Sequence, residues 1–255
     1  MRRMEDKFKV TPKLLELGHK LFLEIEPRDS MYRISSFLIE RLKSNPFGQN
    51  IWITDALLVL LLTWHNAFYR YGTPQNFHNE MKNFIETNRD LLFGNEEISE
   101  QTVKEWFKEL LDILAITTKR GQRRRSGIAV VKTLHLLNPK IFPLWDEYIA
   151  EAYLGNVDTK RFDHYWKFKK FVDIQYEWYK ENFEEVEKAK FYKKLDELNY
   201  VLFTRSNLSA ESLKNLIQLL KENIAQVEEG KNELVQHLES AEENIYLNVL
   251  KIIEC

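Results

Sequence analysis

Cysteine is almost absent from this 255-residue sequence, because the one cysteine, Cys255, is the final residue. No disulfide can form within the chain, and no zinc or iron–sulfur site can be built from cysteine ligands. The six histidines are scattered without the spacing of metal ligands, so we expect no metal and no other cofactor. This cysteine usage suits a reducing compartment, and we expect a cytoplasmic or nucleoid-associated protein.

Glycine and proline are also scarce, at 8 and 6 residues. So few turn-forming residues disfavour a β-sandwich and a nucleotide-binding fold built on glycine loops. The sequence contains no P-loop motif, no His-Glu-x-x-His and no Gly-x-Ser-x-Gly. It therefore gives no support to an NTPase, a zinc protease or a serine hydrolase.

Long apolar runs are missing as well. The strongest one, 51–62, is 12 residues long and contains Asp55. A helix that crosses a bilayer needs about 20 residues, so this run predicts a buried helix instead. The first ten residues, MRRMEDKFKV, lack the apolar centre of a signal peptide. We expect no membrane partner.

Apolar residues recur at helical spacing along nearly the whole chain, and alternating strand patterns are rare. Hydrophobic residues make up 44% of the sequence, enough for a substantial core. The sequence therefore predicts an all-α protein of ten or eleven helices. We place them at 12–25, 30–43, 54–70, 75–92, 99–116, 126–137, 146–154, 161–181, 184–203, 210–228 and 232–253.

The pattern divides the chain into a helical body, 1–205, and a C-terminal helical pair, 206–255. The pair contains four lysines and nine glutamates, a net charge of −5, which leaves +3 on the body. An apolar stripe from Leu213 to Ile252 requires a covering surface. We expect the pair to pack on the body. The alternative is an interface with a partner or a second copy, which would make a homodimer through 206–255.

A basic connector lies between the helices predicted at 99–116 and 126–137, and Ser126 can cap the second of them. Cations beside a helix N-terminus suit a phosphate backbone, because the free N–H groups there also favour anions. The alternative is a solvated turn with ordinary surface charges. The five cations fall within seven residues that contain no acid: Lys119, Arg120, Arg123, Arg124 and Arg125.

Two ionisable residues, Lys132 and His135, lie in the largely apolar helix that follows. Lys132 is a candidate nucleophile, because an amine with apolar neighbours can form a Schiff base with a sugar carbon. The alternative is a lysine that reaches the surface or pairs with a carboxylate. His135, three residues further, lies on the same side of the helix. It is a candidate for a base pocket, or else a hydrogen-bonded core histidine.

An aspartate opens the next helix after Phe142-Pro143-Leu144-Trp145. Asp146 is a natural N-cap. An ionised carboxylate held by helix N–H groups could also stabilise a cationic sugar transition state or position a water molecule. Trp145 is our candidate for the wall of a base pocket, because aromatic rings stack on bases. The alternative for the abundant aromatic residues is that they fill the helical core.

The segment 99–155 resembles the helix-hairpin-helix DNA glycosylase superfamily. In that superfamily a hairpin between two helices holds the DNA backbone, and a short apolar link leads to an aspartate that begins another helix. The sequence NPKIFPLWD, 138–146, is similar to the link of the alkyladenine type. The resemblance implies a glycosylase-like helical body, with Asp146 as the catalytic carboxylate and double-stranded DNA as the partner.

From these features we expect a DNA-repair hydrolase. It would flip a damaged or mispaired base and cleave its N-glycosidic bond with Asp146, and whether it also has lyase activity stays open. Two alternatives also stay open. One is a non-enzymatic helical protein that binds nucleic acid through the same basic connector. The other is an interaction protein that acts through its C-terminal helices.

Overall fold

The computed structural model describes residues 10–26, 29–43, 50–94, 97–155, 157–183, 185–203, 211–212, 214–216 and 218–219. The second helix of the C-terminal pair, 232–253, and most of the first lie outside these residues. The proposed packing of that pair and the homodimer through 206–255 therefore stay predictions.

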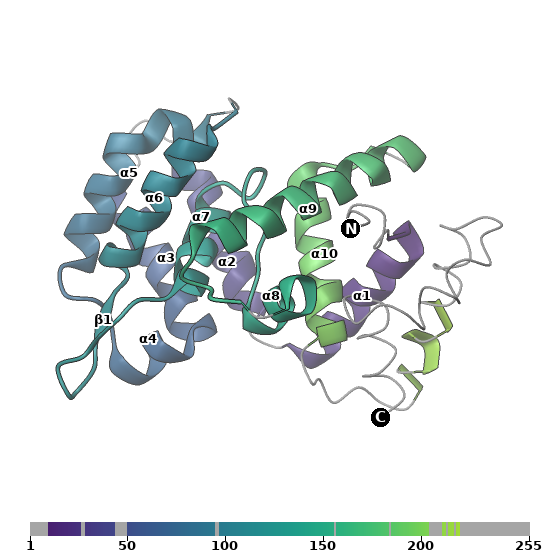
Figure 1. Ribbon diagram of the computed structural model, residues 1–255, viewed down its shortest axis with the longest axis horizontal. Coiled ribbons are helices and arrows are strands. Elements are labelled where there is room, and N and C mark those ends of the chain that lie inside the picture. The colour runs from purple at the N-terminus through teal and green to yellow at the C-terminus, as the bar shows by residue number, and fades with distance from the viewer. Residues whose placement is uncertain are drawn as a thin grey trace. The chain divides into compact units, whose positions relative to one another are not determined.

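The expected all-α class is confirmed, and the described residues contain ten helices and one two-stranded sheet. No helix among them is long and apolar enough to cross a lipid bilayer. The elements in chain order are α1 (Pro12–Ile25), α2 (Asp29–Lys43), α3 (Asn50–Trp64), α4 (Asn66–Tyr71), α5 (Phe77–Phe93), α6 (Glu100–Ile113), β1 (Ile116–Thr117), β2 (Arg123–Arg124), α7 (Gly127–Leu137), α8 (Glu147–Leu154), α9 (Phe162–Asn182) and α10 (Lys188–Phe203) (Figure 1).

Polar residues fix the starts of several helices. The side chains of Thr11, Ser99, Ser126 and Asp146 accept hydrogen bonds from the first turns of α1, α6, α7 and α8. These bonds satisfy backbone N–H groups that have no partner inside a helix. The helix predicted to begin at residue 54 begins earlier, because α3 starts at Asn50 and Thr54 lies buried within it.

The chain divides into two compact units. One contains α1, α8, α10 and most of α9. α1 packs along α10, where Gly18 allows a close approach, because a Cβ atom there would meet Leu198 at 2.7 Å. Tyr153 of α8 meets Phe168 and Phe171 of α9 with ring centroids 5.2 and 5.0 Å apart, so aromatic side chains form much of this core.

The other unit contains α2 to α7, the small sheet and the turn Asp158–Asp163. α7 contacts α2, α3 and α6 and is buried along most of its length. Its first residue, Gly127, lies against the turn, where a Cβ atom would come within 1.7 Å of the carbonyl oxygen of Thr159. A side chain does not fit there, and this glycine fixes the start of α7 beside the basic connector.

Candidate nucleic-acid interface

The basic connector forms a β-hairpin. Ile116 and Thr117 pair with Arg124 and Arg123 in antiparallel register. At the tip, the N–H of Thr118 donates to the carbonyl of Gln122 over 2.9 Å, and Gly121 supplies the left-handed backbone of the turn, with φ at 74°. Figure 1 shows this hairpin projecting from the helices of its unit, beside the label β1. The preceding helix ends at Ile113 instead of the predicted residue 116.

Three arginines of the hairpin have a fixed position. Nε of Arg125 donates to Oδ1 of Asp112 over 2.9 Å, and Nη2 of Arg123 donates to the carbonyl of Asp112 over 3.0 Å. The guanidinium of Arg124 lies 5.8 Å from the ring centre of Tyr71. One carboxylate and one aromatic ring therefore orient three exposed guanidinium groups.

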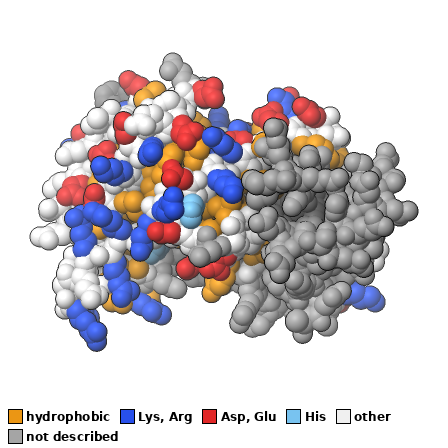
Figure 2. Space-filling view, in the orientation of Figure 1, with side chains coloured by type: hydrophobic (Ala, Val, Ile, Leu, Met, Phe, Trp, Pro, Cys, Tyr) orange, Lys and Arg blue, Asp and Glu red, His pale blue; other side chains and the backbone are white. Residues whose placement is uncertain are grey.

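The other two cations, Lys119 and Arg120, stand at the exposed tip of the hairpin. Neither makes a hydrogen bond or an ion pair with any residue that the structure describes. Figure 2 shows Lys and Arg side chains, in blue, gathered at the lower left, where the hairpin projects in Figure 1. Among the described residues Asp112 is the one carboxylate that contacts these five cations, and the hairpin carries a strong positive charge.

Ser126 follows the hairpin and begins α7. Its Oγ accepts a hydrogen bond from the backbone N–H of Ala129 over 3.3 Å and lies 2.7 Å from Nε2 of His65. The other ring nitrogen of His65, Nδ1, accepts from the N–H of Ala67 over 3.2 Å. The ring proton is therefore on Nε2, which donates to Ser126. Because Oγ already accepts two bonds, its own hydrogen can point to a further acceptor such as a phosphate oxygen.

The charge state of His65 is consistent with this arrangement. Burial lowers its pKa, and the positive charge of Lys132 lowers it further, to about 4. The imidazole is therefore neutral at pH 7. A neutral ring that carries its proton on Nε2 positions the Ser126 hydroxyl but cannot remove a proton from it.

Lys132 lies half-buried in the same region. Its Nζ donates to the carbonyl oxygen of Trp64 over 2.8 Å and stands 5.5 Å from the centre of the Trp64 ring. These contacts tie α7 to the end of α3. The role of Lys132 as a Schiff-base nucleophile stays a prediction.

His135 is buried in the core of this unit, with no exposed surface. Its Nδ1 lies 2.6 Å from the carbonyl oxygen of Phe142, and its Nε2 lies 2.7 Å from the hydroxyl of Tyr32. A carbonyl only accepts, so Nδ1 carries the proton. His135 therefore has the hydrogen bonds of a core histidine. A core histidine was the alternative to a role in a base pocket, and that role stays a prediction.

Asp146 and Trp145 belong to the other unit. The predicted cap at Asp146 is confirmed, since its Oδ1 accepts from the N–H of Ile149 over 2.9 Å. Trp145 is 1% exposed and packs against Tyr165 and Phe168, with ring centroids 5.4 and 5.5 Å away. Its indole N–H is buried without a hydrogen-bond partner among the described residues. Its rings lie in the core. Core packing was the alternative given for the aromatic residues, and the base-pocket role of Trp145 stays a prediction.

The chain matches no protein-family model, no curated protein and no solved structure. Its function must therefore be argued from its own residues. The structure brings together the hairpin, Ser126 and Lys132. It adds three residues that the sequence analysis did not single out: His65, Asp112 and Tyr71.

The sequence gives little indication that these three residues belong to the site. Asp112 is the second-last residue of α6 and so falls outside the run of cations. His65 and Tyr71 are distant in sequence from the hairpin, and folding alone brings them to it.

Proposed function

We propose that this protein binds double-stranded DNA through the basic hairpin. The observation that supports this most directly is the arrangement of its five cations: Asp112 and Tyr71 hold three guanidinium groups, and the two cations at the tip have no partner among the residues that the structure describes. Side chains that are already oriented lose less conformational entropy on binding. Cations that contact phosphates release counterions, which supplies much of the affinity for duplex DNA.

The start of α7 adds a further contact to this surface. Ser126 comes directly after Arg125, and its hydroxyl hydrogen is available to an acceptor because His65 and Ala129 both donate to its oxygen. A hydroxyl at a helix N-terminus suits a phosphate oxygen. In this proposal the hairpin supplies charge, while Ser126 supplies a directed hydrogen bond.

The experiment compares two double variants with the same change of charge. Lys119→Gln with Arg120→Gln removes the tip cations, and Lys104→Gln with Lys108→Gln removes two exposed cations of α6 as a control. The affinity for a random duplex is measured against salt concentration. The tip variant should flatten the slope of log affinity by up to about 0.9 for each lost phosphate contact, and the control should retain it. Equal slopes in the two variants and the wild type would remove the hairpin from the DNA interface.

A second candidate function is base excision. It is favoured by one observation: the Asp146 carboxylate is held at the N-terminus of α8 by the N–H of Ile149. Helix N-termini favour a negative charge beside them, and a carboxylate in that position can stabilise an oxocarbenium-like sugar and orient a water molecule. The damaged or mispaired base would leave the stack before the bond is cleaved, because the reacting atoms are inaccessible inside a duplex. Release of the base from a damaged duplex, compared between wild type and Asp146→Asn, tests this proposal.

A further inference from the structure

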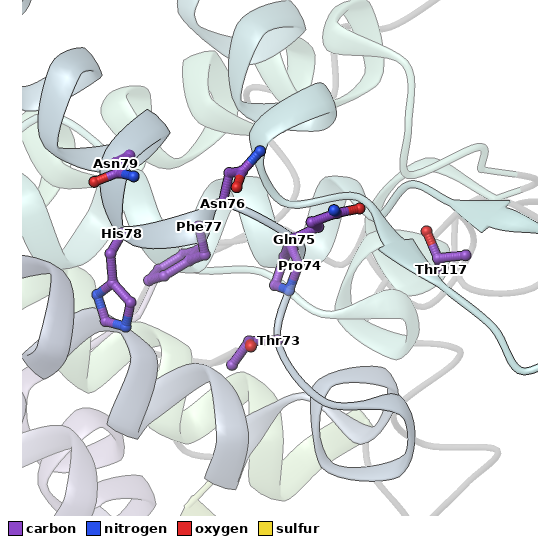
Figure 3. A pocket seen from close by; sticks show the side chains of 8 residues that line it. All are labelled: Thr73, Pro74, Gln75, Asn76, Phe77, His78, Asn79 and Thr117. Atoms are coloured by element: carbon purple, nitrogen blue, oxygen red, sulfur yellow. The ribbon is translucent and has the colours of Figure 1, made fainter.

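A polar pocket adjoins the hairpin within the same unit. Its volume is about 530 Å³, inside the range of small-molecule sites. The loop between α4 and α5, the first turn of α5 and Thr117 of β1 line it. Thr117 is the register partner of Arg123, so one residue belongs to both the pocket and the basic hairpin. Figure 3 shows Thr117 and His78 at opposite ends, with Pro74 and Phe77 between them.

The lining is neutral and rich in hydrogen-bonding groups. Gln75, Asn76 and Asn79 are exposed, and their amides make no hydrogen bond with any described residue. Thr73 and Thr117 add hydroxyls, and neither lysine nor arginine lines the pocket. An amide presents a donor and an acceptor side by side, which matches the edge of a nucleobase. A pocket without cations does not suit a free phosphate, and one with this many polar groups does not suit an apolar ligand.

His78 contributes a fixed aromatic ring. Its Nδ1 lies 3.1 Å from the hydroxyl of Thr54 and 3.4 Å from a carboxylate oxygen of Asp55, and its side chain remains 43% exposed. Phe77, which is almost fully buried, packs edge to face against this ring at 5.4 Å. An immobilised and partly exposed ring is a platform on which a base can stack.

On the basis of the proposed DNA binding, we propose that this pocket receives one unpaired nucleobase of the nucleic acid that the hairpin holds. The ring of His78 stacks on the base, and the amide of Gln75 or of Asn79 bonds to its edge. Thr117 places the pocket directly beside Arg123, so a strand whose phosphates contact the hairpin can deliver a base to it. The pocket belongs to the unit that does not contain Asp146.

The first experiment compares a fully paired duplex with the same duplex carrying one extra, unpaired base, using each of the four bases in turn. The wild type should bind at least one bulged duplex about 5- to 100-fold more tightly, which is the range for one stacked base. In at least one of the variants Gln75→Ala and Asn79→Ala this preference should fall towards unity, while affinity for the paired duplex is retained. The control is Asn83→Ala, an exposed amide one turn further along α5 that does not line the pocket.

The second experiment does not depend on DNA binding. Deoxynucleosides are titrated into the protein while the side-chain amide signals of Gln75 and Asn79 are followed by NMR. At least one nucleoside should shift these signals and leave those of Asn83 in place. If the wild type binds no duplex but the shifts occur, the hairpin proposal fails and the pocket stands. If DNA binds without preference for a bulge and no nucleoside shifts the signals, the pocket proposal is overturned and the hairpin proposal stands.

Discussion

Nε2 of His65 donates a hydrogen bond of 2.7 Å to Oγ of Ser126, which lies 61 residues further along the chain. The same ring accepts the backbone N–H of Ala67 at Nδ1, which fixes the tautomer. A histidine that activated Ser126 as a nucleophile would need the opposite tautomer, with a bare Nε2. His65 therefore caps α4 and Ser126 caps α7, and the hydrogen bond between them connects the two helix starts and orients the serine hydroxyl beside the hairpin.

Acid should weaken the fold through His65. Its pKa is about 4 in the folded protein, against an ordinary value of 6.5, so only the unfolded chain binds this proton between those pH values. The contribution of neutral His65 to the free energy of unfolding is fully present above pH 6.5 and is lost as pH falls towards 4. The difference between pH 7 and pH 4.5 should be on the order of 2 kcal/mol, measured by urea unfolding at both pH values.

The control for this effect is His65→Asn, which cannot titrate and can still cap a helix. Other groups, mainly carboxylates, also titrate in this window, and they are common to both proteins. The variant should therefore lose less stability between pH 7 and pH 4.5 than the wild type does. Parallel losses would show that His65 is not the group responsible.

Removal of Asp112 should strengthen DNA binding. Asp112→Asn deletes the carboxylate that contacts Arg123 and Arg125, while the bond from Arg123 to the backbone carbonyl remains possible. We expect roughly two- to fivefold tighter binding at low salt, because the loss of a charge that repels phosphate should outweigh the loss of the orientation that Asp112 gives to Arg123 and Arg125. The cost in stability should stay below about 1 kcal/mol, since these ion pairs are exposed.

The matched control for charge is Asp90→Asn, an exposed acid of α5. It should change affinity by less than Asp112→Asn does. Weaker binding by Asp112→Asn would mean that the orientation of the arginines outweighs the loss of repulsion.

Substitution by alanine should destabilise the protein to different extents at Gly127, which lies beside the hairpin, and at Gly121, which lies in its turn. Gly127→Ala would force a Cβ atom to within 1.7 Å of the Thr159 carbonyl oxygen, so either α7 or the turn must move. We expect a loss of about 3 kcal/mol in chemical denaturation, the upper end for overpacking. Gly121→Ala has open space and suffers only the strain of a left-handed backbone, about 1 kcal/mol. A smaller loss for Gly127→Ala than for Gly121→Ala would contradict the packing described here.

Helical periodicity was sufficient to predict most of the fold. The helix predicted at 12–25 agrees with α1 at both ends, because Thr11-Pro12 marks its start and Leu15, Leu21 and Phe22 follow its buried face. The helix predicted at 54–70 was less accurate. It begins earlier, at Asn50, and it is interrupted at His65, although apolar residues continue on both sides. The break is stabilised by the bond between His65 and Ser126, which no local pattern reveals.

The candidate site, too, was predictable only where it depends on residues that are neighbours in sequence. A count of charges located the cations, and Ser126 and Asp146 were recognised as caps because capping depends on neighbours in sequence. The β-hairpin was not predicted: each strand has only two residues, and Ile116 continues the apolar pattern of the helix before it. The pocket joins the α4–α5 loop to Thr117, and residues so far apart meet only through packing.

The last prediction concerns catalysis by Asp146. Asp146→Asn should keep the fold, because asparagine caps helices about as well as aspartate does. It should also keep DNA binding, since no cation is lost. It should lose most base release, because a neutral amide cannot offer negative charge to an oxocarbenium-like transition state. The measurement is release of the base from duplexes that carry deaminated, oxidised or alkylated bases, with both proteins assayed side by side.

The companion variant is Lys132→Ala, which separates two forms of the reaction. A Schiff base between Lys132 and the sugar would be trapped by borohydride in the wild type and not in the variant. Absence of trapping in both, together with base release that depends on Asp146, would indicate hydrolysis without a lyase step. Equal base release by wild type and Asp146→Asn on every substrate, including none, would leave Asp146 without a catalytic role. The hydrogen bond from the N–H of Ile149 to its carboxylate would then be a structural reason for an aspartate at this position, and the hairpin would serve binding without chemistry.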